Sequence, residues 1–219
     1  MKNLILIFGV FLFAIAKGQS DSIAFAKING EVYKAVYNHN GTLLILNHVG
    51  KPVFSTNKKT LYDEGFWKLE FKDFDGDGYK DVVVEYYSNV PDCQDLILYD
   101  KQTRRFVLIK DFPDFPAPVH LKGTNLYYSY HRSGCADNNW DSDLFKIVNF
   151  KIVKIGNISG QDCVDPPDKP GIFICKINGK NELLVKKYPL SEIENFKYSK
   201  WGFIAWYWKR NCYNFNASN

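Results

Sequence analysis

Residues 67–87 read WKLEFKDFDGDGYKDVVVEYY, and this stretch decides the fold class. Its two ends, Trp67 to Phe71 and Val82 to Tyr87, are rich in aromatic and β-branched residues, which favour strands. Between them, Asp73 to Asp81 is a short loop rich in aspartate and glycine. The stretch therefore predicts two strands joined by an acidic loop.

The acidic loop has the pattern of a cation site. Its carboxylates stand at loop positions 1, 3, 5 and 9, which are Asp73, Asp75, Asp77 and Asp81. Two like charges 4 Å apart repel by about 4 kcal/mol at an effective dielectric constant of about 20, so this density of aspartates indicates a cation. Ca²⁺ suits the loop because it accepts several oxygen ligands in irregular geometry, and the backbone carbonyl of Tyr79 is available at position 7.

The loop is not an EF-hand, because Val84 stands at position 12, where an EF-hand has glutamate. The stretch FKDFDGDGYKDVVV, residues 71–84, instead resembles the calcium-binding half of FG-GAP/VCBS-type repeats, in which such a loop joins two strands of a propeller blade. The resemblance covers about 15 residues. It implies Ca²⁺ as the cofactor, held by the side chains of Asp73, Asp75, Asp77 and Asp81 and by the carbonyl of Tyr79.

A second resemblance extends over the following residues. The acidic loop is followed by LILYDKQTRRFVL, residues 96–108, and by YSYHRSGC, residues 128–135. This order is similar to that of a group of exported bacterial proteins with one calcium loop. The group contains inhibitors and immunity proteins that act on lysozyme-like enzymes, so the resemblance implies a protein partner of that kind.

The rest of the chain alternates strand-forming runs with turn residues. Hairpin turns are indicated at Asn38–Gly41 and Asn178–Lys180. One short helix is predicted at residues 192–199, where Ser191 and Glu194 form a capping-box pattern. Residues 201–208, WGFIAWYW, are apolar at nearly every position and are interpreted as a buried strand. The predicted fold is all-β and antiparallel, a small propeller-like or barrel-like domain over residues 19–219.

The N-terminus has the three-part layout of a secretory signal peptide. Lys2 precedes the apolar run Leu4–Ala16, and Ala16 and Gly18 supply small residues near the expected cleavage point. Residues 1–18 are therefore predicted to be removed on export, to the periplasm or beyond the cell. The apolar run is too short to span a bilayer of about 30 Å, so no stable membrane insertion is expected.

Five cysteines agree with an oxidising compartment. None forms a CxxC pair, so disulfides are favoured over a zinc site. We predict two bridges, Cys163–Cys175 across a proline-rich loop and Cys93–Cys135 between neighbouring strands. Cys212 is then the unpaired thiol.

A second polar loop follows Cys135 and ends at Asp143. Anchored by a disulfide, it is a candidate surface for a protein partner or for a second cation. Its candidate contact residues are Ser133, Gly134, Asp137, Trp140 and Asp141.

Composition narrows the function. The net charge of +4 falls to +4 − 2 = +2 without Lys2 and Lys17, which gives no support to nucleic-acid binding. The hypothesis that follows is a non-enzymatic, exported, calcium-stabilised binding protein that inhibits a lysozyme-like wall hydrolase. An alternative is a carbohydrate- or surface-binding adhesin module that uses the tryptophan-rich segment 201–208 on a cell-surface glycan. A second alternative is a secreted hydrolase, although no nucleophile arrangement stands out.

Overall fold

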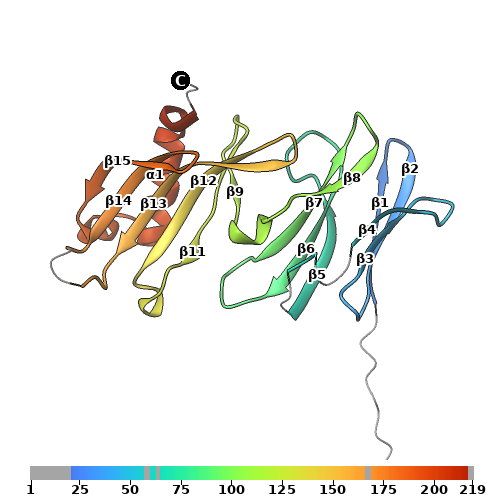
Figure 1. Ribbon diagram of the computed structural model, residues 1–219, viewed down its shortest axis with the longest axis horizontal. Helices are drawn as coiled ribbons and strands as arrows, with labels where there is room; N and C mark the ends of the chain where they lie inside the picture. Colours follow the sequence, from blue (N-terminus) through green and yellow to red (C-terminus); the bar gives the residue numbers. More distant parts are fainter. Residues whose placement is uncertain (1–20, 57–59, 63–64, 166–168, 217–219) are drawn as a thin grey trace, which may run out of the picture.

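The computed structural model describes residues 21–56, 60–62, 65–165 and 169–216. The predicted signal peptide lies outside these residues. The described residues form three antiparallel sheets and one α-helix. Figure 1 shows the sheets side by side, with the helix against the last of them. The strands follow one another in chain order, so most neighbours in each sheet are joined by hairpins.

The first two sheets are four-stranded meanders. The first sheet has the order β1-β2-β3-β4, with bounds Ser22–Ile28, Glu31–Tyr37, Leu43–Leu46 and Pro52–Thr56. The second sheet has the order β5-β6-β7-β8, with bounds Gly65–Lys72, Asp81–Tyr87, Gln94–Asp100 and Arg105–Leu108.

The third sheet has seven strands, and its main path runs β15-β14-β13-β12-β10-β9, with β11 paired to β12. Its strands are β9 (Val119–His120), β10 (Leu126–Tyr128), β11 (His131–Arg132), β12 (Trp140–Val148), β13 (Lys151–Gln161), β14 (Gly171–Asn178) and β15 (Asn181–Tyr188). The last element of the described residues is α1 (Lys200–Asn216). Three short 3₁₀ turns, η1 (Phe112–Asp114), η2 (Cys135–Asp137) and η3 (Leu190–Asn195), lie in the connections.

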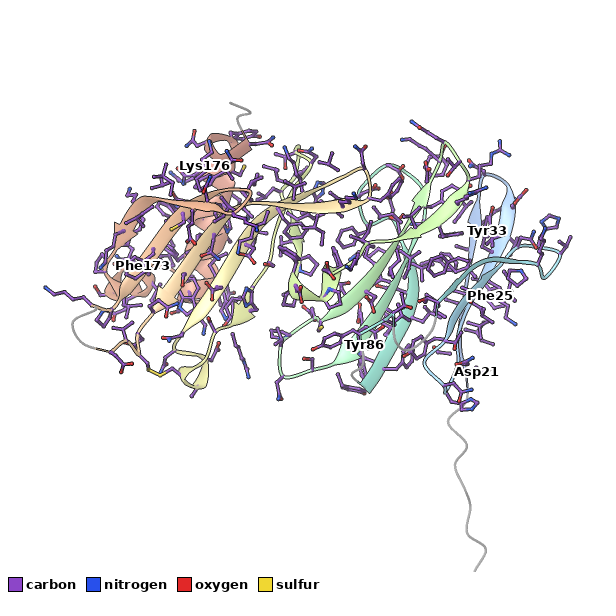
Figure 2. The ribbon with its side chains drawn as sticks, in the orientation of Figure 1. Asp21, Phe25, Tyr33, Tyr86, Phe173 and Lys176 are labelled. Atoms are coloured by element: carbon purple, nitrogen blue, oxygen red, sulfur yellow. A yellow bond between two sulfur atoms is a disulfide. The ribbon has the colours of Figure 1, made fainter. Side chains whose placement is uncertain are left out.

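Three apolar clusters hold these layers together. The first and second sheets share one cluster, in which Tyr33 of β2 and Tyr86 of β6 are buried; Figure 2 labels both residues. The second and third sheets share another, built around Val83, Phe112 and Phe145. The third cluster lies between the third sheet and α1. The layer order is therefore sheet, sheet, sheet, helix.

The second sheet is covered on both faces, which explains the sequence of β6. Val82 and Val84 pack in the cluster shared with the first sheet, whereas Val83 packs in the cluster shared with the third. Successive residues of a strand point to opposite faces. A strand with one face in solvent would alternate apolar and polar residues. Because β6 is covered on both faces, its valines are all buried.

The predicted fold class, all-β and antiparallel, is confirmed. The described sheets do not close into a barrel. None of the described helices is long and apolar enough to span a membrane.

The interpretation of residues 201–208 as a buried strand is wrong, because they form the first half of α1. The buried residues of α1 recur at helical spacing, and they are Phe203, Ile204, Tyr207, Trp208, Cys212 and Phe215. Aromatic residues favour strands locally, and an eight-residue window hides a period that is visible over seventeen residues. Packing against the third sheet decides the helical state.

The predicted helix at 192–199 is also wrong. Only the 3₁₀ turn η3 (Leu190–Asn195) forms there, its N-cap residue is Pro189, and no side chain caps it. The Ser191–Glu194 pattern therefore does not act as a capping box.

Candidate functional site

The acidic loop joins β5 to β6, as the sequence predicts. One carboxylate oxygen from each of Asp73, Asp75 and Asp81 lies within 4.8 Å of the others. Two oxygens that bind one Ca²⁺ at 2.3–2.6 Å can stand at most about 5 Å apart. The three side chains are thus spaced as ligands of a single calcium ion would be.

Hydrogen bonds inside the loop fix this spacing. Asp73 accepts the N–H groups of Gly76 at 2.9 Å and Gly78 at 3.1 Å. The two glycines have φ of +78° and +89°, values that glycine adopts without steric cost. The backbone therefore wraps around Asp73, and the carboxylates converge.

Asp81 fixes the loop to the second sheet. Its side chain is buried, and it accepts the N–H of Phe74 at 2.9 Å and the N–H of Tyr99 at 2.8 Å. Burial, together with the charges of Asp75 and Asp77, raises the pKa of Asp81 to about 7 against the lowering effect of the two hydrogen bonds. A cation in the loop would oppose this shift because it favours the ionised carboxylate.

Asp77, the fourth predicted ligand, is not part of the cluster. It accepts the N–H of Tyr79 at 2.9 Å, and its other oxygen lies 3.4 Å from Nζ of Lys101. Lys101 lies in the turn after β7. Nothing in the sequence near the aspartates predicted this contact. The roles of Asp77 and of the Tyr79 carbonyl as ligands stay predictions.

The disulfide joins Cys135 to Cys163, so both predicted pairings, Cys93–Cys135 and Cys163–Cys175, are wrong. Cys135 precedes β12 and Cys163 follows β13, and the pairing of Trp140 with Gly160 brings these ends together. Cys93 lies buried with its sulfur 3.9 Å from the carbonyl of Pro113. Cys175 is a buried thiol on β14. Cys212 is outside any disulfide, as predicted.

The segment Ser133–Asp137, which we call the anchored loop, is exposed at its tip but held at its ends. Ser133, Gly134 and Ala136 are exposed. Asp137 accepts the hydroxyl of Tyr130 at 2.5 Å and forms an ion pair of 2.8 Å with Lys200 at the start of α1.

The backbone of the anchored loop is strained. Three successive non-glycine residues, Cys135, Ala136 and Asp137, have φ between 51° and 73°, a region that such residues rarely adopt. Asn139 supports the turn, because its Oδ1 accepts the N–H groups of Asp162 at 2.8 Å and Cys163 at 3.0 Å. The disulfide and these hydrogen bonds keep the loop in this strained conformation, which an unsupported loop would not retain.

The other two predicted contact residues lie below the surface. Trp140 is 1% exposed, so a direct contact with a partner is excluded and that prediction is wrong. Asp141 is half-buried and accepts the side-chain amide of Asn157 at 3.4 Å. Among the described residues, the segment 137–143 brings together no group of three metal-ligating atoms.

A group of charged side chains around the buried Asp143 lies beside the anchored loop, and the sequence analysis missed it. Asp143 is 5% exposed and lies 2.5 Å from Nζ of Lys154 and 3.6 Å from Nε2 of His131. Asn157 donates to the same carboxylate at 2.8 Å. The pKa of Asp143 is lowered by His131 and Lys154 against the effect of burial, and that of His131 is raised by its hydrogen bond to Asp143.

No protein-family model and no curated protein matches this chain. The fold is similar to a solved structure described as a Xanthomonas type IV secretion system related protein, with a TM-score of 0.50 and 18% identity. That match covers 78% of this chain and 96% of the other. The Dos1 propeller overlaps less well, with a TM-score of 0.27 and 13% identity over 76% of this chain and 59% of that one.

The disulfide fits export, because such bonds form and persist in oxidising compartments.

Proposed function

We propose that this chain is an exported, non-enzymatic binding protein that inhibits a lysozyme-like wall hydrolase with its anchored loop. The observation that carries the proposal is the combination of an exposed tip with fixed ends. A loop that is ordered before binding loses little conformational entropy on binding, so more of its contact energy becomes affinity.

The contacts of Asp137 support this role. Lys200 donates to the side chain of Asp137 and also to its backbone carbonyl at 2.7 Å. The lysine is only 15% exposed, so this ion pair is screened less than a surface pair. Strained backbone persists only where its surroundings hold it, and it gathers at functional sites.

Ca²⁺ would stabilise the protein in this proposal. Asp73, Asp75 and Asp81 would hold the ion, with Asp77 and the Tyr79 carbonyl able to complete the shell after small movements. The acidic loop joins β5 to β6 at the centre of the stack, so the ion would stabilise the second sheet. The export of the protein to the periplasm or beyond the cell belongs to the same proposal, and a fold neighbour related to a secretion system is compatible with it.

An inhibition assay tests the proposal. The purified protein, residues 19–219, is titrated against several lysozyme-like hydrolases acting on cell-wall suspensions. Replacing Ser133, exposed at the tip, with lysine should weaken inhibition about ten-fold or more, without changing the unfolding midpoint. The matched control is Ser191→Lys, which changes an exposed serine elsewhere. The absence of inhibition across the hydrolases would overturn the proposal, as would equal inhibition by the Ser133 variant.

A further inference from the structure

A cleft of about 390 Å³ opens beside the start of α1, between the second sheet and the segment 117–119. Its aromatic lining comes from Tyr128, Tyr130 and Trp201. Trp201 is 42% exposed, and its ring centroid lies 3.6 Å from that of Tyr130. The indole is thus fixed in position by the tyrosine and still presents surface to the cleft.

Two largely buried side chains present polar groups to this cleft. Gln94 is 7% exposed and Tyr128 is 9% exposed. No described residue forms a hydrogen bond with the side-chain amide of Gln94 or with the hydroxyl of Tyr128. Burial alone accounts for the raised pKa of Tyr128. Their polar ends still reach solvent, because among the described residues only Oγ1 of Thr56 is a buried side-chain polar atom without a partner. Both groups are therefore open to a polar ligand in the cleft.

The charged side chains that line the cleft limit the kind of ligand that it can bind. Glu85 and Asp92 supply acceptors, and Lys72 supplies donors. The Glu85 carboxylate already lies 3.9 Å from Lys68. With Lys68 counted, two carboxylates stand with two lysines, so the charges of the lining favour neither an anion nor a cation. The mixture of donors and acceptors favours an uncharged ligand whose groups both donate and accept.

We propose that this cleft binds a short, uncharged saccharide. Its hydroxyl groups would donate to Glu85 and to the Gln94 oxygen and accept from Tyr128, while an apolar sugar face would lie on Trp201. The volume lies at the lower end of the range for small-molecule sites, which runs from about 300 to about 1,000 Å³. The site goes beyond the inhibitor function, because a saccharide ligand needs no contact with the tip of the anchored loop.

A titration followed by NMR tests the site with two probes, cellobiose and the β-1,4-linked disaccharide of N-acetylglucosamine, each at millimolar concentration. We expect at least one probe to shift the side-chain amide signals of Gln94 and the indole N–H signal of Trp201. If neither probe shifts these signals, the proposal is overturned and the cleft holds only water or a segment of a protein partner.

Two variants sharpen the test. Gln94→Leu should weaken binding about ten-fold while the unfolding midpoint changes little, because the Gln94 amide forms no hydrogen bond with the described residues. Trp201→Ala should abolish the binding, whereas its control, Trp67→Ala, changes an indole that is 54% exposed on β5 and should bind normally. Wild-type affinity in Gln94→Leu would contradict the proposal. Hydrolase inhibition is measured on the same variants, because it depends on the anchored loop and so tests the proposed function separately from saccharide binding.

Discussion

Trp140 on β12 lies flat against Gly160 on β13, so that a β-carbon on the glycine would stand 2.1 Å from Cε2 of the indole. These residues are direct partners across the hairpin, and the disulfide closes just beyond them. Gly160→Ala should lower the free energy of unfolding by about 1–3 kcal/mol, since overpacking forces the indole out of its place. Urea denaturation measures the change.

The control for that variant is Gly65→Ala. A β-carbon at Gly65 would lie 3.7 Å from Tyr87, which is an ordinary van der Waals contact. We expect it to change stability by no more than about 0.5 kcal/mol. Equal stability of the Gly160 and Gly65 variants would show that Trp140 does not need the glycine.

Calcium should raise the melting temperature, because a ligand that binds only the native state stabilises it. At a free concentration of about one hundred times the dissociation constant, the gain is about 2.7 kcal/mol. Asp75→Ala should melt at one temperature in EGTA and in excess Ca²⁺. The control is Asp114→Ala, an exposed aspartate outside the loop, which should keep the full calcium response. An unchanged melting temperature of the wild-type protein would exclude the metal site.

Asp81 should matter even without metal. Asp81→Asn leaves one acceptor oxygen for the two N–H groups of Phe74 and Tyr99, so one buried donor loses its partner. We expect a loss of about 1–3 kcal/mol in EGTA, measured by urea denaturation. A variant as stable as the wild type in EGTA would show that Asp81 serves the metal alone.

The disulfide should be essential for the anchored loop. Replacing Cys135 and Cys163 with serine opens a loop with a sequence separation of 28 residues and should cost about 2–4 kcal/mol. Mass spectrometry of non-reduced peptides should find Cys135 linked to Cys163.

Burial and Glu182 raise the pKa of Cys175 to about 12, so this thiol should resist alkylation until the protein unfolds. A peptide that links Cys163 to Cys175 would contradict the structure.

The His131–Asp143 pair should make stability depend on pH. The folded pKa of His131 is raised above 6.5, so its contribution is complete below about pH 6.5 and is lost as the pH rises through the folded value. The folded pKa of Asp143 is lowered, so its contribution is lost only as the pH falls below about 3.8. The nearby Lys154 opposes the histidine shift and Asp141 supports it.

Urea midpoints at about pH 5.5 and about pH 8.5 measure this effect. The wild-type protein should lose stability between the two values, and His131→Gln should lose less. His39→Gln is the control, because His39 pairs with Asp21 only at 3.8 Å on an exposed surface. A difference between the two pH values that is unchanged in His131→Gln would assign the dependence to another group.

Local patterns predicted most of the strands because each strand has a local signal. Turn residues such as Asn38 and Gly41 lie between runs of strand formers, and hairpins pair neighbours in the chain. The same local signal failed at Trp201 to Trp208, where strand-forming aromatics belong to a helix. The buried spacing from Phe203 to Phe215 becomes visible only when the window includes the whole of α1.

The candidate sites show the same division. The spacing of the aspartates predicted a cluster, and three of the four side chains converge because Gly76 and Gly78 let the backbone wrap around Asp73. Asp77 is outside this group and pairs instead with Lys101, from the turn after β7. Such a contact depends on the fold and not on spacing along the chain.

The sequence by itself determined the antiparallel β class and the position of the acidic loop, because both follow from residues close together in the chain. Only the tertiary structure decided the disulfide partner of Cys135, the helical state of α1, the burial of Trp140 and the cleft beside Trp201. Each of these depends on contacts between segments far apart in sequence. The free energy of burying one face against another outweighs the local preference of any single segment.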